Sequence, residues 1–473
     1  MRFRPAFCFV TICLAGAQTR AANTVFVPDQ FPTLQAAVNA TSPGDTVIIR
    51  PGTYNGTTTF ANKNITIQST DPNDPAVVDA TILDGQGAGT VLYITGPDTS
   101  TVRGLTFRNG DGLFGGGLTL NGANVLVENN LFRSNHTTGR GGGMHIFDAA
   151  PTLRGNRFTE NVSATFGGAL LIQAPSGPVE IVDCTFFNNT AKDGGGIAAL
   201  GGTVTIRNAR ILDNHATHAS AANGGGIYNS GTVNLLNSLV ASNDATAGSG
   251  GDGGGIANFG NLNMLNVTIV DNVVSNAGGG GGIFQGGGTI LVSNSVCWGG
   301  QPSEIAAAPG TNAPSFTYSD TPGRTPVPGA GNIAEDPMFA DPDGADDVPG
   351  TLDDDYRPGP GSPLIDAGNN EDVPPKVMTD LDGNVRFFDD PDVIDVGFGD
   401  APIVDMGCFE GQGAGPCVAD FDGDGDRDLD DLQLLLFNFG RFVVPFTGGD
   451  ADGDSDVDLD DLQLLLFYFG TPC

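Results

Sequence analysis

Short runs of alternating apolar and polar residues dominate the chain between about residue 90 and residue 300. Residues 179–182, 203–206 and 289–292 are examples, and Gly, Asn or Ser bounds each run. Alternation with a period of two is typical of β-strands that bury one face. No amphipathic helix of ten residues fits between the runs, which excludes a fold of alternating strands and helices.

Two sequence marks repeat with the same period as these runs. The first is the tetrapeptide Gly-Gly-(Gly/Ala)-aliphatic, which ends at Leu118, Met144, Leu170, Ile197, Ile227, Ile256 and Ile283. The steps between these residues are 26, 26, 27, 30, 29 and 27. The second mark is an apolar residue a few positions before an asparagine, at Asn135, Asn161, Asn189, Asn214, Asn243 and Asn272. Two marks with one period indicate a repeat architecture.

A repeat of about 27 residues with two or three strands is one coil of a β-solenoid. We therefore predict an all-β fold, a right-handed single-stranded parallel β-helix over residues 23–300. Equivalent residues of stacked coils lie about 4.8 Å apart, so the recurrent asparagines should form hydrogen-bonded ladders. The recurrent glycines should allow positive φ, and each aliphatic residue after them should point into the core. Residues 31–39 predict a short helix that covers the first coil, and residues 42–54 predict a turn and a strand.

These segments carry a resemblance to known families. Residues 31–54 resemble the opening of secreted β-helix proteins of the pectate-lyase-like and pectinesterase-like group. The two repeat marks resemble the repeat of chlamydial polymorphic outer-membrane proteins. Together the resemblances cover about residues 25–300 and imply the fold, but they imply no particular activity.

The composition narrows the class of protein. The chain has 473 residues, 55 acidic and 20 basic, with a net charge of −35. This charge argues against nucleic acid and anionic membranes as partners, and favours cation binding. Residues 1–22 predict a secretory signal peptide, and no other segment could span a membrane, so we expect a protein that is secreted and either extracellular or associated with the cell surface. The mature chain would keep five cysteines, Cys184, Cys297, Cys408, Cys417 and Cys473, of which Cys184 predicts a buried small apolar residue.

The C-terminal segment contains a duplication at an offset of 30 residues. Each copy places aspartates at alternate positions and continues as Asp-Leu-Gln-Leu-Leu-Leu-Phe. Acids at positions 1, 3, 5, 9 and 12 match a calcium loop of the EF-hand type, in which position 7 supplies a backbone carbonyl. The predicted metal residues are Asp420, Asp422, Asp424, Asp426, Asp428 and Asp431 in the first loop, and Asp450, Asp452, Asp454, Asp456, Asp458 and Asp461 in the second.

Each unit is a loop followed by a helix, because the segments before the loops contain Gly and Pro. Over residues 413–473 this duplication resembles the type I dockerin module. The resemblance implies two bound calcium ions and a cohesin-like partner. Position 6 is Gly425 in the first loop but Ser455 in the second, so the second site should be weaker. Cys417 and Cys473 bracket the module and are candidates for a disulfide. We expect the apolar faces of the two helices to pack on each other, through Leu432, Leu435, Leu436, Phe439, Leu462, Leu465, Leu466 and Phe469.

Residues 301–412 lose the repeat and gain Pro, Asp and Gly. Residues 362–368, 380–386 and 404–410 resemble the closing region after β-helices of bacterial surface proteins, sometimes described as a choice-of-anchor domain. This resemblance implies a cap over the last coils. Residues 341–347 and 353–355 could form a calcium site or a solvated acidic loop.

The sequence shows no local pattern of a polysaccharide-degrading enzyme. Asn-Thr-Asp, Arg-Ile-Lys and Trp-x-Asp-His are absent, and Arg140, His145 and Asp148 are loose candidates for a catalytic group. The residues just before the glycine runs should stack from coil to coil and could bind an extended glycan or serve stability alone; they are Phe114, Arg140, Phe166, Asp193, Asn223 and Asp252. The sequence thus favours a secreted, non-catalytic, calcium-binding protein that is tethered through its dockerin-like tail. Such a protein would be a structural or adhesive protein at the cell surface or outside the cell, or a polysaccharide-binding protein. The alternative is a dockerin-bearing polysaccharide lyase or glycoside hydrolase.

Overall fold

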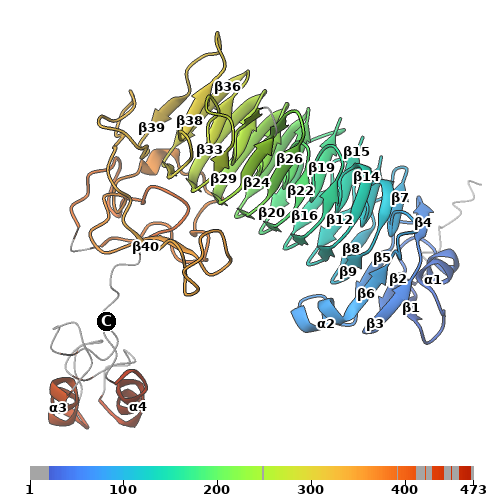
Figure 1. Cartoon of the computed structure of the whole chain (residues 1–473). Helices are drawn as coiled ribbons and strands as arrows, with labels where there is room; N and C mark the ends of the chain where they lie inside the picture. Colours follow the sequence, from blue (N-terminus) through green and yellow to red (C-terminus); the bar gives the residue numbers. More distant parts are fainter. Residues whose placement is uncertain are drawn as a thin grey trace, which may run out of the picture.

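The computed structural model describes residues 21–247, 250–390, 393–411, 421, 429–441, 449 and 457–469. The predicted signal peptide lies almost wholly outside the described residues, as do Cys417, Cys473 and most of both calcium loops. Figure 1 shows a long stack of parallel coils. One side of this stack is a parallel sheet of ten strands. The chain is therefore a parallel β-solenoid, as the repeat predicts. Among the described residues, no helix is both long enough and apolar enough to span a bilayer.

Three sheets run along the coils, the first of them in two rows, and two further strand pairs lie outside these sheets. The first row is β1 Thr24–Val27, β2 Thr46–Ile49, β5 Thr66–Ser69, β8 Thr101–Arg103, β12 Leu126–Glu128, β16 Thr152–Arg154, β20 Val179–Val182, β24 Thr203–Arg207, β29 Thr232–Ala241, β33 Asn261–Val270, β36 Thr289–Ser293 and β39 Ser315–Thr317. A companion row, joined to the first through the long strands β29 and β33, is β3 Gly52–Asn55, β6 Thr81–Asp84, β9 Thr106–Arg108, β13 Leu131–Arg133, β17 Arg157–Thr159, β21 Thr185–Phe187, β25 Arg210–Leu212 and β37 Val296–Trp298.

The second row is β4 Thr58–Ala61, β7 Leu92–Thr95, β11 Leu118–Asn121, β15 Met144–Phe147, β19 Leu170–Gln173, β23 Ile197–Leu200, β28 Ile227–Asn229, β32 Ile256–Asn258, β35 Ile283–Gln285 and β38 Ile305–Ala307. The third row is β10 Asp111–Phe114, β14 His136–Arg140, β18 Val162–Ser163, β22 Thr190–Ala191, β26 His215–His218, β30 Asp244–Ala247 and β34 Val273–Val274. The pairs are β27 Ala222–Asn223 with β31 Gly251–Asp252, and the antiparallel β40 Phe339–Asp341 with β41 Asp355–Pro358.

The repeat marks set the register of the second row. Each aliphatic residue that ends a glycine run is the first residue of a strand, and these residues pair from coil to coil, as in Leu118 with Met144 and Met144 with Leu170. All of them are buried in one core cluster. Gly141 has a φ of +68°, and a Cβ on Gly142 would lie 2.3 Å from the carbonyl oxygen of Gly168. Glycine is therefore required by the turn conformation and by the close approach of neighbouring coils.

The predicted asparagine ladder is confirmed. Asn135, Asn161 and Asn189 are fully buried, and each side-chain amide donates to the carbonyl oxygen of the next, at 3.0 Å and 2.9 Å. The ladder continues through Asn214 and Asn243 to Asn272. A parallel stack of phenylalanine rings lies in the core, with centroids 4.7–5.0 Å apart from Phe107 to Phe186. The ladder satisfies the buried backbone at the turns, while the stack fills the interior.

Replacing Asn189 with leucine is expected to lower the free energy of unfolding by about 2–4 kcal/mol, since several buried groups would lose their partners. Asn189 accepts from the backbone and the side chain of Asn161 and donates to Asn214 and to Phe158. Asn263→Ala is a matched control, because Asn263 is half-buried and makes one side-chain bond, to Asn234. Urea denaturation should give a loss below about 1 kcal/mol for this control. Equal losses in the two variants would contradict the role of the ladder.

Two short helices lie near the first coils. The helix α1, Leu34–Ala40, begins after Thr33, whose side chain accepts from the N–H of Ala36, and it buries Leu34, Ala37 and Val38. These residues belong to the main core and pack on the first strands, at the place where the sequence predicts a capping helix. The sequence did not predict α2, Pro75–Ala80, which starts at the capping residue Asp74 with proline in its first turn.

The closing region packs along the side of the last coils. The side chains of Leu212, Leu239 and Val270 face outward from the companion row and pack on Tyr356, Leu381, Cys408 and Phe409. Side chains at the ends of the coils bond to it as well: Asn294 binds the carbonyl of Asn369, and Asn266 that of Asp405. The region also contains the short helix η1, Asn370–Asp372. It therefore covers the last coils laterally.

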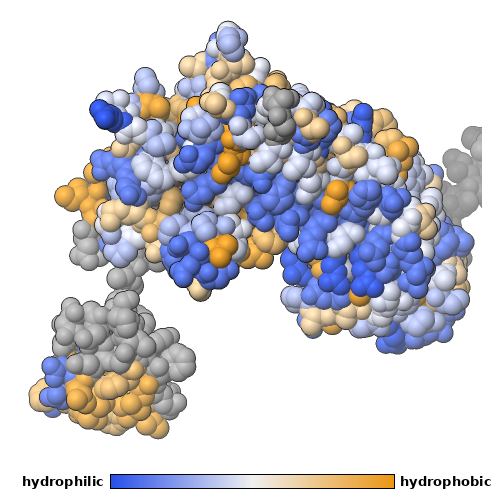
Figure 2. Space-filling model, in the orientation of Figure 1, coloured by the Kyte–Doolittle hydropathy of each residue, from blue (hydrophilic) through white to orange (hydrophobic). Residues whose placement is uncertain are grey.

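The C-terminal segment forms α3, Leu429–Asn438, and α4, Leu459–Tyr468. The predicted packing of the helices is only partly correct. Leu435 and Leu465 are buried with Leu432 and Leu462 around them. Four other residues of the expected apolar face are exposed: Leu436 at 56%, Phe439 at 46%, Leu466 at 57% and Phe469 at 39%. One helix cannot bury two faces against a single neighbour, so part of the apolar side chains remains exposed. Figure 2 shows the resulting apolar surface of this segment.

Candidate functional site

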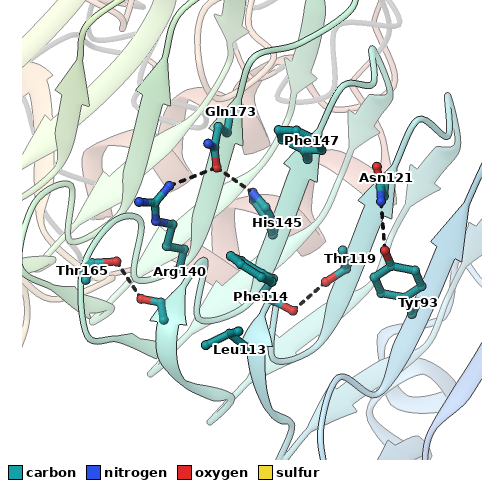
Figure 3. Close-up of a pocket in the computed structure, with 11 residues that line it drawn as sticks. Tyr93, Leu113, Phe114, Thr119, Asn121, Arg140, His145, Phe147, Thr165 and Gln173 are labelled. Atoms are coloured by element: carbon teal, nitrogen blue, oxygen red, sulfur yellow. Dashed lines mark hydrogen bonds between the residues drawn. The ribbon is translucent and has the colours of Figure 1, made fainter.

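A cavity of about 560 Å³ opens on the outer face of the second row, over strands β7, β11 and β15. We call it the pocket. Its walls combine aromatic rings with an imidazole, a guanidinium and amides; the lining residues are Tyr93, Leu113, Phe114, Thr119, Asn121, Gly139, Arg140, His145, Phe147, Thr165 and Gln173. Figure 3 shows their arrangement.

Strand register brings these side chains together. Leu118 and Leu120 point into the core, so the alternate residues Thr119 and Asn121 face outward. Tyr93, Thr119 and His145 are register partners on successive strands and form one column. A second column, two residues further along each strand, holds Asn121, Phe147 and Gln173. Phe114 and Arg140 are the last residues of β10 and β14, and they line the edge of the pocket.

Gln173 joins the guanidinium and the imidazole of the pocket. Its Oε1 accepts from Arg140 at 3.3 Å and contacts Nε2 of His145 at 3.3 Å (Figure 3). Because this oxygen can only accept, Nε2 carries the imidazole proton. At the other end of the pocket, the amide of Asn121 donates to the hydroxyl of Tyr93 at 3.0 Å.

His145 is held as a neutral imidazole. Its side chain lies beneath Phe114, with the rings stacked at 5.4 Å between centroids, and the residue is 4% exposed. Burial lowers the pKa of His145 to about 4; the bond to Gln173 opposes the shift, and nearby Arg140 adds to it. Nδ1 is buried and has no hydrogen-bond partner among the described residues. At neutral pH this ring therefore offers a hydrogen-bonding and stacking surface and is a weak base.

The depressed pKa predicts a pH-dependent stability. Between pH 6.5 and about pH 4 the unfolded chain binds a proton at His145 and the folded chain does not, so acid should destabilise the fold through this residue. The full contribution is roughly 3 kcal/mol, present above pH 6.5 and lost as the pH falls to about 4. The His145→Gln variant lacks this titration. The stability difference between wild type and variant, measured at several pH values, should shift in favour of the variant toward pH 4, and a constant difference would contradict the assignment.

The residues before the glycine runs do stack as predicted. Phe114 pairs with Arg140, Phe166 with Asp193, Asp193 with Asn223, and Asn223 with Asp252. The guanidinium of Arg140 lies 5.7 Å from the ring centroid of Phe166, and Asn223 donates to Asp193 at 2.8 Å. This ladder thus forms the edge of the outward face on which the pocket opens.

Aromatic rings continue from the pocket along the same face. We define the aromatic track as Phe114, Phe147, Phe166, Tyr228, Phe259 and Phe284. Its centroid distances are 5.8 Å for Phe166–Tyr228, 5.4 Å for Tyr228–Phe259 and 6.2 Å for Phe259–Phe284. From β11 to β35 the track spans six inter-strand steps, which amounts to about 30 Å. Phe114, Phe147 and Phe259 are more than one-third exposed, and Phe166 and Tyr228 are partly exposed. These rings offer an extended stacking surface, whereas Phe284 is 8% exposed and packs on Phe259 at the end of the track.

The charge around the pocket differs from that of the whole chain. Residues 90–175 hold six arginines and five acidic residues, whereas the chain carries a net charge of −35. No aspartate or glutamate lines the pocket. Hydrolysis of a glycosidic bond normally requires a pair of carboxyl groups, which this pocket does not provide. An anionic sugar would instead meet Arg140.

The fold brings together two of the three candidate catalytic residues that the sequence suggested. Arg140 and His145 share the pocket through Gln173, whereas Asp148 does not line it. Tyr93, Asn121, Phe147 and Gln173 were missed. A signal for them exists in the sequence: they lie one or three residues after the first, inward-facing residue of their strands, so the repeat places them on the outer face.

Of the predicted calcium ligands, only Asp431, Asp458 and Asp461 belong to the described residues. Asp431 and Asp461 occupy equivalent positions in the first turns of α3 and α4 and are buried. Asp431 accepts from the N–H of Phe421, and Asp461 accepts from that of Asp458 at 2.7 Å. Two buried carboxylates at duplicated positions fit the role of position 12 in a calcium loop. The other nine aspartates lie outside the described residues.

The three cysteines that the structure describes are free and buried. Cys184 is 1% exposed in the core, as predicted for a small apolar residue. Burial raises the pKa of Cys184 and of Cys408 to about 12. These thiols are therefore unreactive parts of the core.

No protein-family model and no curated protein matches the sequence. Among solved structures, the chain resembles pectate lyase Pel9A with a TM-score of 0.41 and 17% identity, over 80% of this chain and 90% of that one. It resembles the PL6 family alginate lyase AlyGC with a TM-score of 0.30 and 15% identity, over 67% and 49%. A mannuronic acid specific family 6 lyase from human gut microbiota gives 0.28 and 12%, over 70% and 85%. These neighbours are polysaccharide lyases, and the likeness concerns the parallel β-solenoid fold alone.

Proposed function

We propose that the protein binds an extended polysaccharide chain along the aromatic track, with an acidic sugar unit in the pocket beside Arg140. The observation that carries the proposal is the alignment of exposed rings with the pocket on one face of the solenoid. Flat apolar rings next to amides and a guanidinium suit a ligand that has both apolar faces and hydroxyl groups. A solenoid edge that served stability alone would not require exposed phenylalanines.

The pocket chemistry explains the preference for an acidic unit. Arg140 is a permanent cation, and Gln173 orients its guanidinium from one side. Tyr93 and Asn121 supply a hydroxyl and an amide at the opposite end. A groove lined only by Asn, Gly and Ser would have favoured a purely structural protein, and the pocket is not of that kind.

The test is the affinity of the mature protein for acidic and neutral polysaccharides. Phe114→Ala and Tyr228→Ala should each weaken binding about 5- to 10-fold, because each removes one stacking surface from the track. Phe398→Ala is the matched control, since Phe398 is an exposed ring in the closing region at 48%. It should bind as tightly as wild type. If the two track variants also bind like wild type, the proposed path of the chain is wrong.

Cleavage by β-elimination is a second candidate function. In this reaction the proton on the carbon next to a uronate carboxylate is removed, a C=C double bond forms, and the C–O bond to the leaving sugar oxygen on the next carbon breaks. Arg140 would neutralise the carboxylate, and Tyr93 would take the proton as a phenolate and return it to the leaving oxygen; both residues line the pocket. It is the one class of the enzymatic alternative that requires no pair of carboxyl groups. Unsaturated products in the binding reactions, lost in Tyr93→Phe and Arg140→Gln, would establish the lyase; intact polysaccharide would leave a binding protein.

For the C-terminal module we propose two calcium ions and attachment to a cohesin-like partner after secretion. The proposal rests on the duplicated aspartates and on the burial of Asp431 and Asp461. Calcium would supply the positive charge that holds the loop carboxylates together. The exposed apolar residues of α3 and α4 are available for such a partner.

A further inference from the structure

Three carboxylates converge within the closing region, away from the pocket and from the C-terminal loops. Asp366, Asp389 and Asp395 each place a carboxylate oxygen within 4.8 Å of the others. Asp366 is fully buried, and the other two are exposed. The cluster thus has a closed inner side and an open outer side.

Hydrogen bonds on both sides hold the backbone of Asp366 in place. Its N–H donates to Asp405 at 2.7 Å, and its carbonyl oxygen accepts from Val396 at 3.0 Å and from Gly397 at 2.9 Å. Yet neither carboxylate oxygen of Asp366 has a hydrogen-bond partner of normal geometry among the described residues. A buried carboxylate without partners is costly, so a ligand that completes it is expected.

The surroundings add negative charge and no cation. Burial first, and then the charges of Asp395, Asp389 and Asp390, together raise the pKa of Asp366 to about 6, against an opposing contribution from the N–H of Asp390. Among the described residues, no ion pair joins a lysine, arginine or histidine to any member of the cluster. The cluster therefore lacks an internal counter-charge.

We propose that Asp366, Asp389 and Asp395 bind a calcium ion. The three ligands offer only oxygen, which hard cations prefer, and no cysteine or histidine is present to favour zinc or copper. Calcium accepts irregular shells completed by water, which the exposed side of the cluster allows. The ion would tie the segment around Asp389 and Asp395 to the strand of chain that packs on the last coils.

The single tryptophan of the chain provides a selective probe. Trp298 packs against the cluster of Val296, Leu364, Ala367 and Met406, and Leu364 and Ala367 flank Asp366 in sequence. The C-terminal module has no tryptophan. Terbium bound at Asp366 should therefore emit when Trp298 is excited, whereas terbium in the C-terminal loops has only tyrosine and phenylalanine nearby in sequence.

The experiment is a terbium titration of the full mature chain with excitation of tryptophan. Wild type should show sensitised emission that calcium displaces, and Asp366→Asn and Asp395→Asn should bind at least about tenfold more weakly at this site. Asp353→Asn, in the neighbouring acidic segment, is the control and should match wild type. Near-ultraviolet circular dichroism verifies the fold of each variant. Absent emission from the wild type, emission unchanged in both cluster variants, or a loss only in Asp353→Asn would each overturn the proposal.

Discussion

Replacing Arg386 with methionine is expected to lower the free energy of unfolding by about 3–5 kcal/mol. Arg386 is fully buried and donates to Glu410 at 3.0 Å, to the side chain of Asn237 at 3.0 Å and to the carbonyl of Gly407 at 2.6 Å. Asn237 belongs to the long strand β29. The guanidinium therefore joins the closing region to the solenoid, and its loss leaves a buried carboxyl and amide without their donor.

The charge balance of this site sharpens the prediction. Burial, and then the nearby carboxyl of Asp405, raises the pKa of Glu410, whereas Arg386 lowers it. Loss of the guanidinium would therefore raise the pKa of Glu410 further and leave its carboxyl group buried without a counter-charge. The control is Arg357→Met, because Arg357 is an arginine of the same region with a side chain 46% exposed. Urea unfolding followed by the fluorescence of Trp298 should show less than about 1 kcal/mol for this control; equal losses would contradict the anchoring role of Arg386.

Removal of calcium is expected to unfold the C-terminal module while the solenoid stays folded. Without metal, the carboxylates of the twelve predicted metal residues repel one another, and the small core around Leu435, Val457 and Leu465 is insufficient alone. Limited proteolysis should release fragments cut after residue 412 in a chelator and leave the chain intact in calcium. Mass spectrometry of the fragments reads the result.

Two variants make this prediction specific. Asp431→Asn with Asp461→Asn should be cut in calcium as wild type is cut in chelator, since both loops lose the same ligand. Asp430→Asn is the control, because Asp430 is exposed beside Asp431. Resistance of the wild type in chelator would show that the helices are stable without metal and would contradict calcium-dependent folding.

The solenoid could be predicted in detail because its information is local and repeated. The glycine runs and the asparagines each indicate which residues of neighbouring coils lie side by side. The structure pairs Leu118 with Met144 and Asn135 with Asn161 accordingly. The lateral position of the closing region was harder, since it depends on Leu212, Leu239 and Val270 facing outward in three coils. A strand pattern alone does not indicate which apolar side chains pack against a segment that lies far along the chain.

The site could be predicted only in part. Stacking before the glycine runs identified Phe114 and Arg140, but not the partners on the neighbouring strands. Tyr93 and Gln173 join them through strand register, and the depth of the pocket depends on how β10 and β14 turn into the second row. The same limit applies to Asp366, whose partners in the cluster are 23 and 29 residues away.

The most direct test of the central claim is the dependence of affinity on the length of an acidic oligosaccharide. If the polysaccharide lies along the aromatic track, the dissociation constant should fall as the oligosaccharide lengthens and level off when it spans the track of about 30 Å. In Tyr228→Ala the same series should level off earlier, because that variant interrupts the track between Phe166 and Phe259. An affinity that is already maximal for a disaccharide, or that does not change with length, would contradict binding along the solenoid.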